Sequence, residues 1–234
     1  MRQVAHIFKR EFKSYFISPI AYIVISVFLL VTGWFFFSTF FIYNQTSLRS
    51  FFSMLPIIFA FVVPAITMRL FSEELNVGSY ETLLTLPVTY RDVILGKFLA
   101  SVVFIMAMLV PTIAYPVTAW LLGQLDWGPV AGGYIGAILL GAAYSAVGLF
   151  ASSLTRNQII AFIIGIAICF SLTLVDKMLF FLPRNLVGLF GYLGADFHFQ
   201  NIAKGVIDSR DLLYFLSISF VGLYCTHLAI QGKK

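Results

Sequence analysis

The sequence predicts an all-α membrane protein with six transmembrane helices. Of its 234 residues, 60% are hydrophobic and only 11% are charged, whereas a soluble domain carries about 25% charged residues. Apolar runs near the ~20 residues that a helix needs to cross a bilayer recur along the chain. These features exclude a soluble globular enzyme and a disordered chain. The net charge of +5 is spread between the apolar runs, so no basic face for nucleic acid is expected.

The expected spans are residues 20–42, 51–68, 98–122, 129–154, 158–175 and 212–230. Residues 1–18 precede them and form a separate element. There, apolar residues recur at helical spacing and basic residues occupy the other face. Such a pattern is typical of an amphipathic helix that lies on the inner leaflet. The predicted organisation is therefore an interfacial helix (1–18) followed by a six-span domain (19–234).

The distribution of basic residues predicts the orientation. An even number of spans places both termini on one side. With that side inside, ten lysines and arginines fall in inner segments and five in outer ones. Because cytoplasmic loops are enriched in these residues, we expect both termini in the cytoplasm, residues 69–97 inside and residues 176–211 outside.

The cytoplasmic segment 69–97 concentrates charge and helix-end signals. Gly78 suits a helix C-terminus, because glycine adopts a left-handed backbone at no steric cost. Residues 80–86 read as a second short helix that Pro87 ends. Thr89, with Asp92 three residues later, matches a capping box that starts the helix of the third span. Such a segment can present a rigid helix to a soluble partner; an ordinary acidic loop is the alternative.

A resemblance to a known family rests on this same segment. The runs Arg69–Glu74, Gly78–Glu81, Leu83–Val88 and Gly96-Lys97 resemble the signature of ABC-2-type transporter permeases. Ser79 stands where many members have threonine, and it keeps the hydroxyl. In that family the segment includes the coupling helix that docks on the ATPase. The resemblance assigns coupling to Glu73, Glu74, Gly78, Ser79, Glu81, Leu84 and Pro87.

A second resemblance lies near the C-terminus. The run Gly205–Asp211, followed by Tyr214-Phe215, is similar to the gliding-motility-associated permeases, a subfamily close to the permeases of multi-copper enzyme maturation. Residues 176–211 are rich in aromatic residues and broken by glycines, so we expect short helices that fold back into the outer interface. The family resemblance implies re-entrant helices and an outer gate here, with candidate residues His198, Lys204, Gly205, Asp208 and Asp211. Lys204 and Asp208, four apart, could pair on one helix face.

No motif for bond chemistry is present in the sequence. It contains no G-x-x-x-x-G-K-[ST] phosphate-binding loop and no G-x-S-x-G nucleophile elbow. Three distant histidines and two cysteines within apolar runs lack metal spacing, so we expect no catalytic residue, no metal and no cofactor on this chain. Under the resemblance, ATP and Mg²⁺ belong to a separate ATPase.

The fourth span carries small residues every four positions: Gly133, Ala137, Gly141 and Ser145. Such residues let membrane helices approach closely, either as static packing, which we favour, or as a mobile seam.

The sequence therefore favours the permease subunit of an ATP-driven ABC-2 exporter in a bacterial inner membrane. The expected partners are two ATPase copies, a second identical or similar permease, and membrane lipid. The cargo cannot be read, although the uncharged spans favour a lipidic, polymeric or amphipathic one. A non-transporting scaffold of a cell-envelope machine and an intramembrane enzyme are the alternatives. The enzyme is disfavoured because the spans lack paired carboxylates and histidine clusters.

Overall fold

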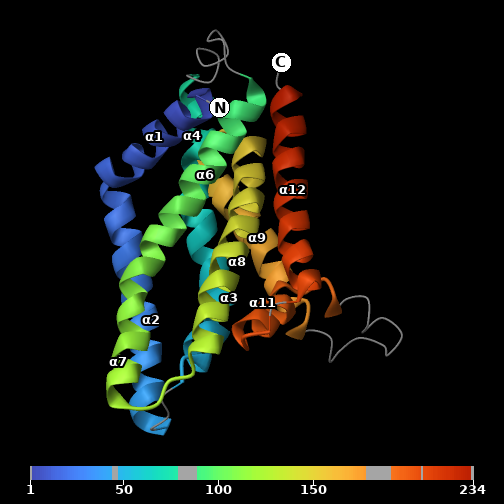
Figure 1. Ribbon diagram of the computed structural model, residues 1–234. Helices are drawn as coiled ribbons and strands as arrows, with labels where there is room; N and C mark the ends of the chain where they lie inside the picture. Colours follow the sequence, from blue (N-terminus) through green and yellow to red (C-terminus); the bar gives the residue numbers. More distant parts are fainter. Residues whose placement is uncertain (1, 44–46, 79–88, 178–190, 207, 233–234) are drawn as a thin grey trace.

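The computed structural model describes residues 2–43, 47–78, 89–177, 191–206 and 208–232, and every regular element within them is helical (Figure 1). The elements are α1 (Arg2–Ile17), α2 (Pro19–Tyr43), α3 (Arg49–Thr67), α4 (Arg69–Val77), α6 (Tyr90–Leu109), the 3₁₀ turn η1 (Val110–Ile113), α7 (Ala114–Leu122), α8 (Trp127–Leu154), α9 (Gln158–Leu174), α11 (Ala195–Ala203) and α12 (Ser209–Gln231).

Five helical stretches in the described part are long and apolar enough to cross a membrane. They are Pro19–Ile42, Arg49–Val77, Tyr90–Leu122, Trp127–Leu154 and Ser209–Gln231. The fifth expected span corresponds to α9, which is apolar but has only 17 residues. The all-helical membrane class is therefore confirmed, with five clear candidate spans.

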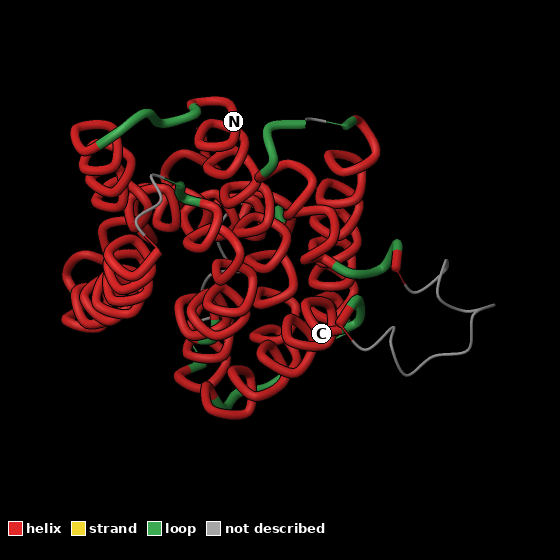
Figure 2. The backbone as a smooth tube through the Cα atoms, turned by 90° about the horizontal axis from the view of Figure 1, so that it is seen from below, coloured by secondary structure: helices red, strands yellow, loops and turns green. Residues whose placement is uncertain are grey.

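Helix α8 forms the centre of the bundle. It packs against α12, α3, α9, α11 and α6, and 72% of its most apolar window is buried. The corresponding figure for α2 and for α12 is 22%, so these two helices lie at the edges of the bundle. Figure 2 shows the same bundle along the helix axes.

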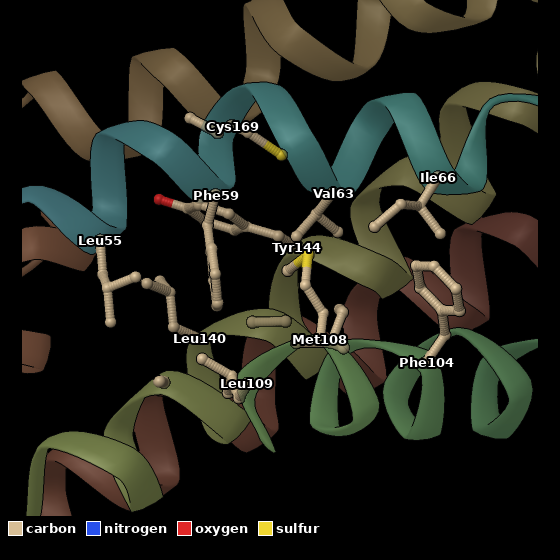
Figure 3. Packing of buried hydrophobic residues seen from close by; sticks show 14 of the residues in the cluster. Leu55, Phe59, Val63, Ile66, Phe104, Met108, Leu109, Leu140, Tyr144 and Cys169 are labelled. Carbon is tan, nitrogen blue, oxygen red and sulfur yellow. The ribbon is translucent and has the colours of Figure 1, made fainter. Parts of the chain in front are cut away.

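Glycines allow other segments to approach α8 closely. A Cβ atom on Gly132 would lie 2.3 Å from the carbonyl oxygen of Ile202 in α11, and one on Gly148 would lie 2.0 Å from Oγ1 of Thr67 in α3. Glycines of α8 therefore pack against other helices of this chain. Apolar side chains from α3, α6, α8 and α9 fill the core of the bundle (Figure 3).

Two spans are interrupted along their length. The regular α-helix of the second span is interrupted at Met68, between α3 and α4. The third changes to 3₁₀ geometry at Val110–Ile113, where Pro111 cannot donate an amide hydrogen bond. The apolar run of this span begins at Phe98, but its helix begins at Tyr90, where the predicted capping box of Thr89 and Asp92 starts it.

Candidate functional site

A buried lysine joins three elements at the end of the bundle where the chain begins (Figure 1). Lys97, near the start of α6, is 1% exposed. Its ammonium donates hydrogen bonds to the carbonyl oxygen of Leu70 (2.7 Å), to Oε1 of Glu74 (2.8 Å) and to Oε1 of Glu11 (3.2 Å). Lys97 therefore binds α4 through Leu70 and Glu74, and α1 through Glu11.

Arg10 contacts the same two carboxylates from the solvent-exposed side of the cluster. Its Nη2 lies 2.8 Å from Oε1 of Glu11 and 3.1 Å from Oε1 of Glu74. Burial alone would raise the pKa of Glu11, but the charge of Lys97 and the hydrogen bond from Arg10 outweigh it, and the pKa is lowered. Two cations thus balance two carboxylates. We call Arg10, Glu11, Glu74 and Lys97 the Lys97 cluster.

Apolar packing places α1 where the cluster can form. Ile7 of α1 packs directly on Gly96, since a Cβ on that glycine would lie 2.7 Å from Ile7 Cγ2. One helical turn from Glu11, the ring of Tyr15 stacks on Phe104 at 4.8 Å between ring centroids. The Tyr15 hydroxyl donates a hydrogen bond to the carbonyl oxygen of Ile66 at 3.3 Å. The amphipathic pattern of residues 1–18 therefore predicted a helix correctly, and its apolar face packs against α6 within this chain.

A serine from α8 forms hydrogen bonds at the junction between α3 and α4. Ser152 Oγ accepts hydrogen bonds from the amides of Phe71 and Ser72, both at 3.0 Å, and donates one to the carbonyl oxygen of Met68 at 2.7 Å. These backbone groups lie at the start of α4, where no helical partner is available. The contact joins the start of α4, the helix that carries Glu74, to α8.

The predicted signals on both sides of residues 79–88 are present. Gly78 follows α4 with φ 75°, in the left-handed region. Thr89 and Asp92 form the capping box at the start of α6. Of the coupling candidates, Glu73 is exposed and Glu74 belongs to the Lys97 cluster. The others, Ser79, Glu81, Leu84 and Pro87, lie outside the described residues, as does the expected short helix 80–86.

The opposite end of the bundle holds a buried histidine–aspartate pair. His198 of α11 and Asp211 of α12 are 4% and 3% exposed, and His198 Nδ1 lies 2.5 Å from Asp211 Oδ1. His198 Nε2 lies 3.0 Å from the carbonyl oxygen of Tyr192, and Tyr214 stacks on the imidazole at 4.0 Å between centroids. Each ring nitrogen of His198 faces an oxygen atom, so these two contacts fix the orientation of the imidazole.

The other outer candidates occupy the turn between α11 and α12. Gly205 has φ 87° and packs against the backbone of Gly128. Asp208 caps α12 by accepting a hydrogen bond from the Arg210 amide at 3.0 Å. The expected pairing of Lys204 and Asp208 on one helix face is wrong, because α11 ends at Ala203 and α12 begins at Ser209. A left-handed glycine between them stops the helix.

The described residues hold no group of three His, Cys, Asp or Glu side chains that could bind a metal ion. Cys169 is buried and Cys225 partly buried, and both are free thiols. The polar residues at both ends of the bundle instead connect helices to one another.

The fold and these two sites define a multi-pass helical membrane protein whose polar groups position helices. The family model for ABC-2 family transporter proteins matches residues 5–202. The chain belongs to the ABC-2 transporter family, and its class is that of a membrane permease component of an ABC system. No curated protein matches the sequence closely enough to count as a relative.

Sequence reasoning missed the central role of Lys97. It placed Lys97 in the family signature with Gly96 and Arg10 among the basic residues of the interfacial helix, but it gave no role to Glu11. One available signal was the single acidic residue among the basic ones of the first helix. A carboxylate there needs a cation, and Lys97 lies at the boundary of an apolar span, where a free charge is costly.

Proposed function

We propose that this chain is the membrane subunit of an ATP-driven ABC-2 export system in a bacterial inner membrane. Six helical spans would cross it: α2, α3 with α4, α6 with α7, α8, α9 and α12. With 17 residues, α9 is at the lower limit for a span. The beginning of α1 and the end of α12 lie at the same end of the bundle (Figure 1), which supports an even number. The excess of basic residues supports placing that end in the cytoplasm.

The observation that carries the proposal is the Lys97 cluster. Residues 79–88 connect α4 to α6, and the ion pairs of the cluster hold these two helices to each other and to α1. A partner that pushes on the connecting segment therefore displaces three elements together. We infer that residues 69–97 receive the movement of the ATPase, with Glu73, Glu74, Gly78, Ser79, Glu81, Leu84 and Pro87 as the coupling residues.

The opposite end is the proposed outer gate. There the buried contact of His198 with Asp211 fastens α11 to α12, and Gly205 supplies the turn between them. Lys204 and Asp208 border this turn. Separation of α11 from α12 would need this buried contact to break, so the pair is suited to hold a closed state.

The proposed complex contains two ATPase chains and two permeases. The second permease is another copy of this chain or a similar one. The exposed apolar faces of α2 and α12 are available to it and to lipid. ATP and Mg²⁺ bind to the ATPase, and this chain needs no cofactor. The cargo is an amphipathic, lipidic or polymeric molecule.

The test uses two substitutions in the complex with its ATPase. Gly78→Val places a β-branched residue at φ 75°, a backbone strain of about 1–2 kcal/mol. Glu81→Lys reverses a charge at the proposed docking surface. Both variants should insert at normal levels but retain less ATPase, or lose stimulation of ATP hydrolysis by cargo.

One control variant and two possible outcomes separate the proposal from its rivals. A variant in an outer turn, Asn44→Lys, should keep the normal ratio of ATPase to permease. If both coupling variants keep normal ratios and stimulation, residues 69–97 are not the coupling segment. A complex whose ATP hydrolysis no candidate cargo stimulates would favour the scaffold.

A further inference from the structure

A polar pocket lies among the end of α2, the start of α3 and α11. These helix ends lie away from the end of the bundle where the chain begins (Figure 1). Its volume is about 430 Å³. A smaller pocket of about 90 Å³ shares Arg49 and Gln200 with it and adds Lys204. The two shared residues make them parts of one polar recess. The larger part is lined by Thr39, Phe40, Ser47, Arg49, Ser50, Ser53 and Gln200.

The charge of this recess is positive. Arg49 and Lys204 line it, and the described lining of both parts includes no carboxylate. The acidic residue beside it, Asp196, is already engaged: it lies 3.2 Å from Nζ of Lys177 and accepts a hydrogen bond from Gln200 at 3.0 Å. Within the part of the chain that the structure describes, neither Arg49 nor Lys204 forms an ion pair with a carboxylate.

Neutral hydrogen-bonding groups accompany the two cations. The hydroxyls of Ser50 and Ser53 lie in the first turns of α3 and line the recess. The Ser47 hydroxyl accepts a hydrogen bond from the Arg49 amide at 3.2 Å, and the positive end of the α3 dipole adds to the charge of Arg49. Arginine, lysine and hydroxyl donors together are the set that proteins use for phosphate oxygens.

The position of the recess indicates the kind of molecule that reaches it. Thr39 lies four residues before the end of α2, and Arg49 is the first residue of α3. The recess therefore lies where two spans end, at the depth of headgroups rather than of acyl chains. Its volume falls in the range of small-molecule sites and exceeds what a bare ion needs.

We propose that this recess binds an anionic, phosphate-type headgroup through Arg49 and Lys204, with Ser50, Ser53 and Gln200 as hydrogen-bonding partners. The phosphate belongs either to a membrane lipid or to a soluble phosphate ester. Binding at this site needs no ATPase, so the proposal stands or fails separately from the proposed export function.

The experiment measures binding to the purified full-length chain in phosphatidylcholine nanodiscs. In one arm, phosphatidylglycerol is added to the discs, and its enrichment on the protein is measured by native mass spectrometry. In the other arm, sn-glycerol 3-phosphate and inorganic phosphate are titrated and followed by ³¹P NMR line broadening. The test variant is Arg49→Gln with Lys204→Gln. Arg210→Gln, an exposed cation at the same end that does not line the recess, is the matched control.

We expect the double variant to bind at least about tenfold more weakly, since two charge-assisted contacts are lost. Arg210→Gln should bind normally, and Arg49→Lys should retain most of the binding. Ser53→Asp, which adds a carboxylate to the recess, should abolish binding without unfolding the protein, as judged by circular dichroism.

The two arms identify the source of the phosphate. Enrichment of phosphatidylglycerol alone assigns the site to a lipid headgroup, and binding of sn-glycerol 3-phosphate assigns it to a soluble ester. Absence of binding in both arms would overturn the proposal. Equal loss in the double variant and in Arg210→Gln would also overturn it, because it would show that only the overall positive charge matters.

Discussion

Replacement of Lys97 by methionine tests whether the Lys97 cluster holds α1 on the bundle. Methionine keeps the length of the side chain and removes its charge. At about 3 Å and an effective dielectric constant of about 20, each contact with a carboxylate is worth roughly 5 kcal/mol before desolvation. Lys97 makes two such contacts, at 2.8 Å and 3.2 Å. Since breaking a buried ion pair typically costs about 3–5 kcal/mol, we expect a loss in that range.

Hydrogen–deuterium exchange of the α1 amides is the appropriate assay, because α1 can open locally while the spans remain inserted. A loss of about 3 kcal/mol lowers amide protection roughly 100-fold. An ordinary hydrogen bond between membrane helices, worth about 0.6 kcal/mol, would lower it only about threefold. These two decreases in amide protection are easily distinguished.

A charge-matched control and a compensating variant complete the experiment. Lys13→Met removes an exposed cation from α1 and should leave exchange unchanged. Replacing Glu11 and Glu74 by glutamine together with Lys97→Met removes the unpaired charges and should restore much of the protection, as replacement of whole ion pairs often does. If the α1 amides of Lys97→Met exchange like those of the wild type, apolar packing rather than the cluster holds α1 on the bundle.

Three further predictions concern single contacts. The pKa of Glu11 is lowered in the folded state, so its contribution to stability should be present above the ordinary carboxyl pKa and lost as pH falls through the lowered pKa. Amide protection of α1 should therefore decline on acidification in the wild type but not in Glu11→Gln. Gly132→Ala should lower the thermal midpoint by the equivalent of about 1–3 kcal/mol, since its Cβ would meet a backbone carbonyl at 2.3 Å. Gly128→Ala, whose nearest contact is 3.4 Å, should leave the midpoint unchanged. Equal midpoints of the two variants would show that α11 can shift away. Ser152→Ala leaves two buried amides without their acceptor and should destabilise the protein by about 1–3 kcal/mol. Ser153→Ala removes only a hydrogen bond within its own helix. Identical stability of the two variants would refute the role of Ser152 at the α3–α4 junction.

The helical spans could be predicted from the sequence because they depend on local properties. Runs of apolar residues of the length of the bilayer identify themselves, and α2, α8 and α12 begin and end within three residues of their expected bounds. The capping box at Thr89 and the left-handed Gly78 were also predictable, since a helix end is determined by a few consecutive residues. Hydropathy alone would place the start of α6 at Phe98, because it detects the apolar part of a helix rather than its beginning; the capping box located the start correctly.

The partners of polar residues were harder to predict, because they depend on which helices meet. Lys204 and Asp208 have the spacing of a helical pair, yet Gly205 between them takes a left-handed backbone and the pair cannot form on one helix. His198 and Asp211, separated by 13 residues, meet only because α11 and α12 fold against each other. Sequence spacing identifies a pair only where the helix between its members is continuous.

The Lys97 cluster shows the same limit and adds a physical constraint that sequence reasoning could use. Lys97 and Glu11 are 86 residues apart, so no local pattern joins them. However, a lysine at the start of an apolar span must reach water or a carboxylate, and α1 carries only one acidic residue, Glu11. The cost of an unpaired buried charge restricts the partners of Lys97 to very few residues. In an apolar chain with only 11% charged residues, each charge near a span boundary is therefore a constraint on which helices pack together.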